Sequence, residues 1–203
     1  MTRMNWVEVV GYVASALVVV SLAMTSVVRL RVISLIGSLT FVAYGLMLPS
    51  IPIIITNACV AGLNVWFLRK EFAPDRDLGA VPIAVDAPFL ADFLRSHQAD
   101  IQRTWPGSTV TAESSFALVL TRDGLPAGAL VGRPEGDTLH LELDYVMAAY
   151  RDSRIGQWLY GAGAKAFRDA GIARIVAQDS PDHGAYLRGV GFVDEGGALV
   201  RTL

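Results

Sequence analysis

The amino-acid sequence predicts three membrane-spanning helices followed by an α+β domain with a mixed central sheet. Charge is unevenly distributed: residues 1–70 contain five basic residues and one acidic residue, and the remainder contains 12 basic and 18 acidic residues. An uncharged run of 20 residues, Val9 to Val28, is followed by a longer uncharged run between Arg31 and Arg69. Residues 80–203 instead contain short alternating and amphipathic segments of both periods. With 53% hydrophobic residues, 18% charged residues and one cysteine, the chain is neither disordered nor held together by internal disulfides.

Two prolines divide the second uncharged run. A bilayer span needs about 20 apolar residues, with a lower limit of roughly 17, so the run from Arg31 to Arg69 is long enough for two spans. Pro49 and Pro52 oppose continuation of one helix through it. We therefore expect helices at about residues 6–26, 31–48 and 52–68. Two alternatives stay open: a cleaved signal peptide at the N-terminus, and a buried helical bundle without a membrane.

Basic residues set the expected orientation. Arg29 and Arg31 lie in the first predicted connection, and Arg69 and Lys70 follow the third helix, against Arg3 alone on the other side. Because basic flanks stay in the cytoplasm, the sequence predicts a multi-pass protein of the inner (plasma) membrane. Its N-terminus is expected outside and its large C-terminal domain in the cytoplasm.

Two asparagines lie in the third predicted helix. Asn57 and Asn64 are seven residues apart, so they share a face that points to a partner helix, a cavity or a second subunit. The segments Tyr44-Gly45, Pro52 to Asn57 and Arg69-Lys70 resemble helices two and three of the SemiSWEET and PQ-loop membrane proteins. The resemblance implies a dimeric sugar carrier with Asn57 facing the solute. Interhelical hydrogen bonding is the alternative role for both asparagines.

The predicted linker is residues 71–79, after the three-helix domain of residues 1–70, and residues 80–203 are long enough for one core. Apolar runs and their periods predict the elements of this domain. The expected strands are residues 81–85, 116–120, 126–131, 139–144 and 172–177, with tail strands from Phe192. The expected helices are residues 86–105, 155–170 and 183–189. Arg122-Asp123-Gly124 is a hairpin signal.

Two motifs carry a resemblance to an enzyme family. Residues 146–159 read Val-Met-Ala-Ala-Tyr-Arg-Asp-Ser-Arg-Ile-Gly-Gln-Trp-Leu, and residues 185–192 read Ala-Tyr-Leu-Arg-Gly-Val-Gly-Phe. Together with the order of elements, they resemble the signatures of the GNAT superfamily of N-acetyltransferases over about residues 80–203. The resemblance implies a GNAT-like fold, acetyl-CoA as the cofactor and an amine as the acceptor.

The first motif has the chemistry of a phosphate-binding turn. A strand ends, the chain turns and a helix begins, so unpaired N–H groups attract an anion. Glycine at position 156 lets the backbone approach a phosphate closely, and Arg154 stands where the family has its first glycine. By resemblance, the pyrophosphate of coenzyme A is bound by Val146, Arg151, Arg154, Ile155, Gly156 and Gln157.

Acetyl transfer also needs a base. A free lysine amine has a pKa of about 10.4, so a positioned group must take the proton of the attacking nitrogen. GNAT enzymes often place an acid on the central strand, which makes Glu142 the first candidate, with Asp144 and His140 on the same face. A solvated or hydrogen-bonded strand face is the alternative. The family's proton-donating tyrosine falls one position from Tyr186, the candidate acid. His183 is expected to cap a helix or lie at the surface.

As a whole, the sequence predicts a membrane-anchored, acyl-CoA-dependent N-acetyltransferase that acts on a small-molecule or protein amine. The expected partners are the lipid bilayer and a second copy in a homodimer. Two other hypotheses stay open: a SemiSWEET-like solute carrier, with Asn57 and Asn64 facing the solute and a regulatory C-terminal domain, and a non-catalytic sensor of coenzyme A. The net charge of −2 argues against a nucleic-acid partner. Phosphate-loop NTPase, nicotinamide-fold and zinc motifs are absent from the sequence, so no metal is expected.

Overall fold

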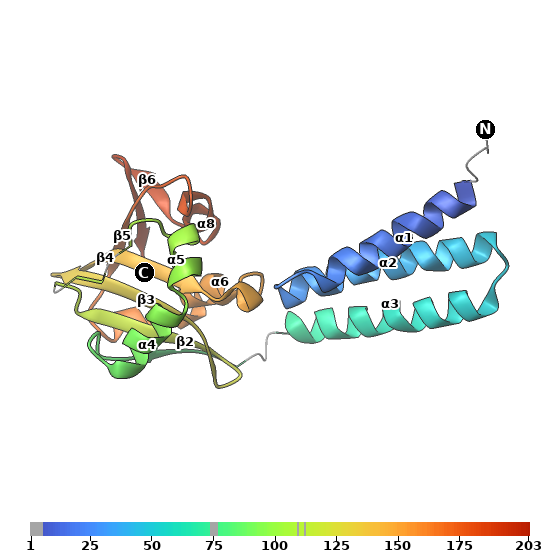
Figure 1. Ribbon diagram of the computed structural model, residues 1–203. Helices are drawn as coiled ribbons and strands as arrows, with labels where there is room; N and C mark the ends of the chain where they lie inside the picture. Colours follow the sequence, from blue (N-terminus) through green and yellow to red (C-terminus); the bar gives the residue numbers. More distant parts are fainter. Residues whose placement is uncertain (1–5, 74–76, 109, 112) are drawn as a thin grey trace. The chain divides into compact units, whose positions relative to one another are not determined.

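The computed structural model describes residues 6–73, 77–108, 110–111 and 113–203. The chain divides into two compact units, Met1–Asp75 and Arg76–Leu203. We refer to the first as the helical unit, because its described residues form three helices, and to the second as the sheet unit (Figure 1).

The helical unit consists of α1 (Trp6–Leu22), α2 (Val27–Met47) and α3 (Ile51–Glu71). By length and composition, α2 and α3 are each able to cross a membrane, whereas α1 has 17 residues and is the shorter apolar helix. Two of the three expected spans therefore meet this criterion within the described part of the chain.

The boundary between α1 and α2 differs from the predicted one because a cap sets it. Ser26 precedes α2, and its hydroxyl oxygen accepts a hydrogen bond from the amide of Arg29 (3.4 Å). Such a cap satisfies an N–H of the first turn, so α2 begins at Val27, before Arg29, and not at Arg31. α1 correspondingly ends at Leu22, four residues earlier than expected.

The third helix begins close to the expected place and ends later. Pro52 is its second residue, where an N–H has no partner within the helix, so proline is tolerated. Arg69 and Lys70 lie in its last turn, where positive charge interacts favourably with the helix dipole. α3 ends at Glu71, and the first strand begins at Leu78. The connection between them is therefore shorter than the predicted linker of residues 71–79.

The sheet unit contains a seven-stranded sheet in the order β1-β2-β3-β4-β5-β7-β6. β4 and β5 are parallel and the other neighbours are antiparallel, which confirms the predicted mixed sheet. The strands are β1 (Leu78–Pro82), β2 (Phe116–Arg122), β3 (Leu125–Glu135), β4 (Thr138–Val146), β5 (Arg174–Gln178), β6 (Val193–Glu195) and β7 (Ala198–Thr202).

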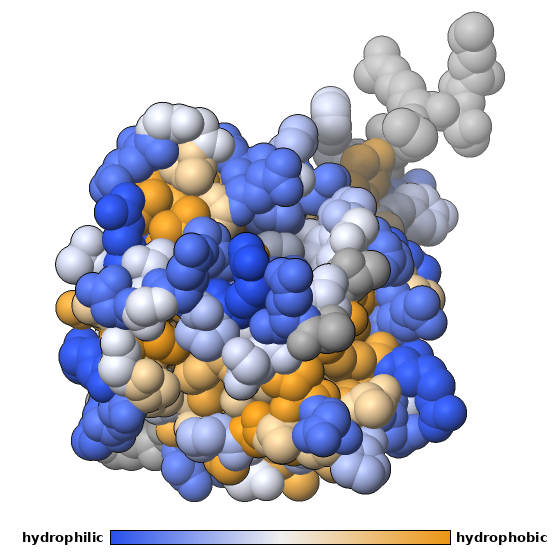
Figure 2. Space-filling model, turned by 90° about the vertical axis from the view of Figure 1, so that its left-hand side faces the viewer, coloured by the Kyte–Doolittle hydropathy of each residue, from blue (hydrophilic) through white to orange (hydrophobic). Residues whose placement is uncertain are grey.

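Short helices cover this sheet. In Figure 1, α4 and α5 cross its near face, and their buried residues Leu90, Phe93 and Ile101 join the hydrophobic core. The helices are α4 (Pro88–Ser96), α5 (Gln98–Thr104), α6 (Ile155–Leu159), α7 (Lys165–Arg168) and α8 (Gly184–Gly189), with 3₁₀ turns at Ala148–Tyr150 and Ala162–Ala164. Figure 2 shows one face of the molecule, on which hydrophilic side chains surround separate hydrophobic patches.

Three predicted elements are corrected. The helix expected over 86–105 is two helices, α4 and α5, because His97 leaves helical geometry (φ −107°, ψ 7°) and its ring Nδ1 lies 2.8 Å from the carbonyl oxygen of Phe93. The helix expected over 155–170 is interrupted at Gly161 (φ −111°, ψ −103°) and becomes α6, a 3₁₀ turn and α7. The first strand lies at 78–82 and not at 81–85, since its backbone pairs with β2 from Leu78 onward.

The hairpin signal is confirmed. Asp123 (φ 50°) and Gly124 (φ 76°) both adopt left-handed conformations between β2 and β3. Two such residues match the twist of the flanking strands.

Two irregularities of β4 shape its far end. Its pairing with β5 ends at Leu141 opposite Ala177, so residues 142–146 continue with no β5 residue beside them. On its other side, Gly132 of β3 pairs with Leu141 and Val131 pairs with Leu143. Glu142 is therefore the extra residue of a β-bulge, a device that redirects a side chain.

Candidate active site

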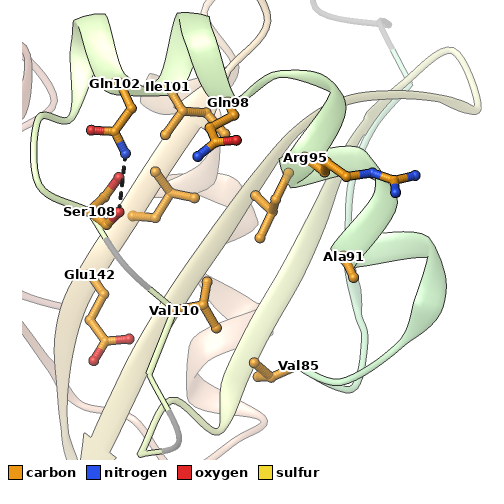
Figure 3. A pocket seen from close by; sticks show the side chains of 11 residues that line it. Val85, Ala91, Arg95, Gln98, Ile101, Gln102, Ser108, Val110 and Glu142 are labelled. Carbon is orange, nitrogen blue, oxygen red and sulfur yellow. Dashed lines mark hydrogen bonds between the residues drawn. The ribbon is translucent and has the colours of Figure 1, made fainter.

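Glu142 lies at the wall of a pocket of about 410 Å³. The bulge places it there, and its Oε2 accepts a hydrogen bond from the Ser114 hydroxyl (2.5 Å) in the segment before β2. Figure 3 shows α5 above the Glu142 carboxylate, with Ser108 between them. The apolar lining is Val85, Ala91, Leu94, Ile101, Val110 and Leu143.

A second pocket of about 260 Å³ shares Ser108 and Glu142 with the first. It is also lined by Leu141, the last β4 residue that pairs with β5, and by Gln178, the last residue of β5. Glu142 thus borders two hollows, one beneath α4 and α5 and one where the sheet opens.

His183 lies beside the second pocket at the N-cap position of α8, as one of the two expectations had it, but it is buried and not at the surface. Its ring stacks on Trp105, with ring centroids 3.7 Å apart and an interplanar angle of 6°. Nε2 lies 3.1 Å from the carbonyl oxygen of Gln178, and Nδ1 is buried without a hydrogen-bond partner among the described residues. The ring therefore presents an unused polar atom inside the sheet unit.

Asp144 is buried on the side of the sheet that α6 and α8 cover. Its Oδ2 accepts hydrogen bonds from the hydroxyls of Tyr160 (2.8 Å) and Tyr186 (2.8 Å), and its Oδ1 is buried with no partner in the described chain. Burial raises the pKa of this carboxyl above its ordinary value, although the two hydroxyls and nearby His183 oppose the shift. Burial likewise raises the pKa of Tyr160 and of Tyr186 well above the usual tyrosine value.

The structure does not bring the three expected strand residues together. Glu142 bonds Ser114, and Asp144 bonds tyrosines from other elements. His140 Nε2 lies 3.2 Å from Glu135 Oε2 near the turn between β3 and β4. The bulge interrupts the alternation on which the expected common face depended.

Arg151, in the turn after β4, makes hydrogen bonds to other residues of the sheet unit. Arg151 Nε donates to the carbonyl oxygen of Val146 (3.1 Å), and its Nη2 donates to Asp100 Oδ2 (2.5 Å). Tyr145 also donates to Asp100 Oδ2 (2.8 Å). The Arg151 guanidinium therefore fixes the turn against α5, and a phosphate would have to compete for it.

Arg154 and the residues after it begin α6. Arg154 has a left-handed conformation (φ 60°, ψ 13°), the geometry that favours glycine and that explains why the related motif has glycine here. Among the described residues, the amides of Ile155, Gly156 and Gln157 donate no hydrogen bond to a backbone carbonyl. A Cβ added at Gly156 would lie 2.3 Å from the Tyr186 hydroxyl oxygen, so only glycine allows this approach of α8 to α6.

The two asparagines of α3 are engaged within the helical unit. Asn64 is buried and its Nδ2 donates to the Ser34 hydroxyl of α2 (3.1 Å), and Asn57 Nδ2 donates to the carbonyl oxygen of Ile53 in its own helix (3.0 Å). Asn64 thus makes the interhelical hydrogen bond that was the alternative to a solute-facing role.

Sequence reasoning missed several residues of the site. Ser114, Asp100 and Tyr160 each bond a predicted residue across at least 16 positions of sequence. No local pattern signals such pairs. For Trp105, helical spacing with Leu90 and Ile101 indicated a core position, which its burial agrees with.

Comparison with known proteins gives one family and several distant likenesses. Residues 83–192 match the acetyltransferase (GNAT) family. A Haemophilus influenzae protein described as uncharacterized is 34% identical over 70 residues, which are 33% of this chain and 91% of that protein.

Solved structures to which the chain is similar include the following three GNAT proteins. A tandem GNAT protein from the clavulanic acid biosynthesis pathway is 15% identical with a TM-score of 0.41, and the match covers 59% of this chain and 45% of that one. An Escherichia coli GNAT family N-acetyltransferase in complex with CoA is 19% identical (TM-score 0.40; 64% and 84% covered). A Brucella melitensis GNAT family acetyltransferase in complex with acetyl-CoA is also 19% identical (TM-score 0.42; 64% and 90% covered).

The family match takes in Glu142, Asp144, the turn after β4 and Tyr186. Because it extends over more than half of the 203 residues, this chain belongs to the acetyltransferase (GNAT) family.

Proposed function

We propose that the chain is a membrane-anchored, acetyl-CoA-dependent N-acetyltransferase. The observation that carries the proposal is the position of Glu142, whose carboxylate borders both pockets of the sheet unit. An amine that enters beneath α4 and α5 then meets a base at the point where the sheet opens. Family membership supports the reaction type.

Features at the open edge of the sheet fit acetyl-CoA. β4 continues for five residues beyond its last pair with β5, and the second pocket lies at this opening. The amides at the start of α6 are unpaired with backbone carbonyls among the described residues, and Arg154 precedes them. When bound, acetyl-CoA supplies the acetyl group as an activated thioester.

The chain's own residues then handle two protons. Glu142 takes a proton from the attacking ammonium, and Ser114 orients the carboxylate by donating to its Oε2. Tyr186 stays protonated at neutral pH because burial raises its pKa, so it keeps a proton to donate to the leaving sulfur. In the structure this O–H is donated to Asp144 Oδ2, so the hydroxyl has to turn from Asp144 to the sulfur when the proton is transferred.

The helical unit serves as the anchor in this proposal. α2 and α3 each have 21 residues, and both are apolar enough to cross a bilayer. The basic residues Arg29, Arg31, Arg69 and Lys70 favour a cytoplasmic position for the sheet unit.

The test is release of free thiol from acetyl-CoA by the purified full chain in detergent, measured with a panel of primary amines. Replacing a general base typically costs about 10²–10⁴-fold in rate, so Glu142→Gln should lower kcat by about that factor at neutral pH. Glu113→Gln is the matched control, since Glu113 is exposed and pairs with Arg133 (3.1 Å). A Glu142→Gln variant as active as the wild type would refute the assignment of the base.

A further inference from the structure

The walls of the first pocket point to a class of acceptor, an inference that rests on the proposed acetyltransferase function. Six of its lining residues are apolar, and they come from the segment after β1, from α4, α5 and β4, and from the segment before β2: Val85, Ala91, Leu94, Ile101, Val110 and Leu143. With a volume of about 410 Å³, the pocket lies in the range of small-molecule sites. An apolar body of modest size fills such walls without leaving polar groups unpaired.

The charges around the pocket are few. Among the described lining residues, Glu142 is the acid and Arg95 is the base. Arg95 pairs with Asp92, and Figure 3 shows its guanidinium directed away from Glu142. A second ammonium group on the acceptor would therefore find no carboxylate, and a carboxylate on the acceptor would find no inward-facing cation.

The polar groups of the pocket are also partly committed. Gln102 Nε2 donates to the Ser108 carbonyl oxygen (3.4 Å), and its Oε1 accepts from the amide of Gly107 (3.2 Å). Its amide thereby binds the backbone of both Gly107 and Ser108, and Figure 3 shows the bond to Ser108. Gln98 also lines the pocket, and its side-chain amide makes no hydrogen bond to the described residues.

We propose that the acceptor is a primary amine carried on an apolar body, with no second charged group. Its ammonium lies at Glu142, and its apolar part lies against Leu94, Ile101 and Val110. Polycationic amines and amino acids bind poorly in this proposal, because their second charge would be desolvated against the apolar lining without a partner.

Three amines of equal chain length test this class: hexylamine, hexane-1,6-diamine and 6-aminohexanoate. The expected kcat/KM for hexylamine exceeds that for each of the other two by about tenfold or more, the penalty expected for one unpaired charge at the walls. Equal or faster turnover of the diamine or the amino acid would overturn the proposed class and leave the acetyltransferase function standing. Thiol release with other amines of the panel but with none of these three would overturn the class and leave the acetyltransferase function standing.

A second acid in the wall gives an independent test. Ala91 lines the pocket from an exposed position of α4, so Ala91→Glu adds a carboxylate without disturbing the core. It should raise the diamine-to-hexylamine ratio of kcat/KM by about tenfold. Ala99→Glu, at an exposed position of α5 outside the lining, should leave the ratio unchanged. If Ala91→Glu also leaves it unchanged, this pocket does not hold the acceptor and the proposal fails.

Discussion

Asp144 joins three elements of the sheet unit through one buried carboxyl. It lies on β4 beyond the last residue that pairs with β5, and it accepts hydroxyl bonds from Tyr160 after α6 and Tyr186 of α8. The backbone pairing of β4 with β5 ends before Asp144. Beyond that point, these side-chain hydrogen bonds connect β4 to the residue after α6 and to α8. An unpartnered Oδ1 in this setting favours the neutral acid, because a buried charge without enough partners is costly.

Replacing this carboxyl by an amide has a pH-dependent consequence. The pKa of Asp144 in the folded chain is raised above 3.8, its value in an exposed chain. Its contribution to stability is therefore complete below pH 3.8 and is lost as pH rises through the raised pKa. Asp144→Asn stays neutral, so its free energy of unfolding relative to the wild type should increase as pH rises above 3.8. Denaturant-dependent hydrogen exchange of β4 measures this, and a difference that does not vary with pH would contradict a raised pKa.

At the residue scale, the sequence identified side chains better than their surroundings. Alternation placed Glu142 and Asp144 on a strand, and both lie on β4. The bulge opposite Val131 and Gly132 has no local signal, so the separate surroundings of the two acids were not predictable. The tyrosine partners of Asp144 are brought to it by the tertiary fold alone.

At the scale of elements, α6 and α8 meet through the absence of a side chain at Gly156. A Cβ there would lie 2.3 Å from the hydroxyl oxygen of Tyr186 and 3.0 Å from Cε2 of its ring. Gly156→Ala should therefore displace Tyr186 from Asp144 and destabilise the sheet unit by about 1–3 kcal/mol. Thermal and denaturant unfolding of the full chain in detergent measures the loss.

Two further variants isolate the cause of that loss. Gly189→Ala is the matched control, since a Cβ at Gly189 meets open space at the end of α8 and should not destabilise the chain. In a Tyr186→Phe background the cost of Gly156→Ala should fall, because the nearest atom is gone. An undiminished cost would mean that the contact with the hydroxyl does not explain the glycine.

Element types were predicted more reliably than their ends. The period of the apolar residues predicted the strands and the mixed sheet, and two left-handed residues made the hairpin at Asp123 and Gly124. The breaks at His97 and Gly161 were missed because helical periodicity continues across each of them. The start of α2 was missed because charge at Arg29 was given more weight than the cap at Ser26.

For the whole molecule, the division into a helical unit and a sheet unit follows the change in composition. The segment with long uncharged runs forms α1 to α3, and the acidic remainder forms the sheet unit. The motifs of residues 146–159 and 185–192 indicated the acetyltransferase family, and the match over 83–192 confirms it. The sequence did not indicate the pocket in which the acceptor is proposed to bind, because its lining comes from separate segments between Val85 and Leu143.

Membrane anchoring gives a prediction at this scale. The full chain expressed in bacteria should stay with the membrane fraction after an alkaline carbonate wash, because α2 and α3 span the bilayer in the proposal. A reporter fused after Leu203 should be active in its cytoplasmic form. Release into the supernatant would contradict the anchor, and a periplasmic signal would contradict the orientation.

Isothermal titration calorimetry of the purified full chain with acetyl-CoA tests the central claim most directly. The account predicts saturable binding of one acetyl-CoA per chain, displaced by free coenzyme A, in the same detergent that gives no heat without protein. No saturable heat up to millimolar acetyl-CoA would contradict the account, because Glu142 would then lie beside a pocket with no acetyl donor to serve.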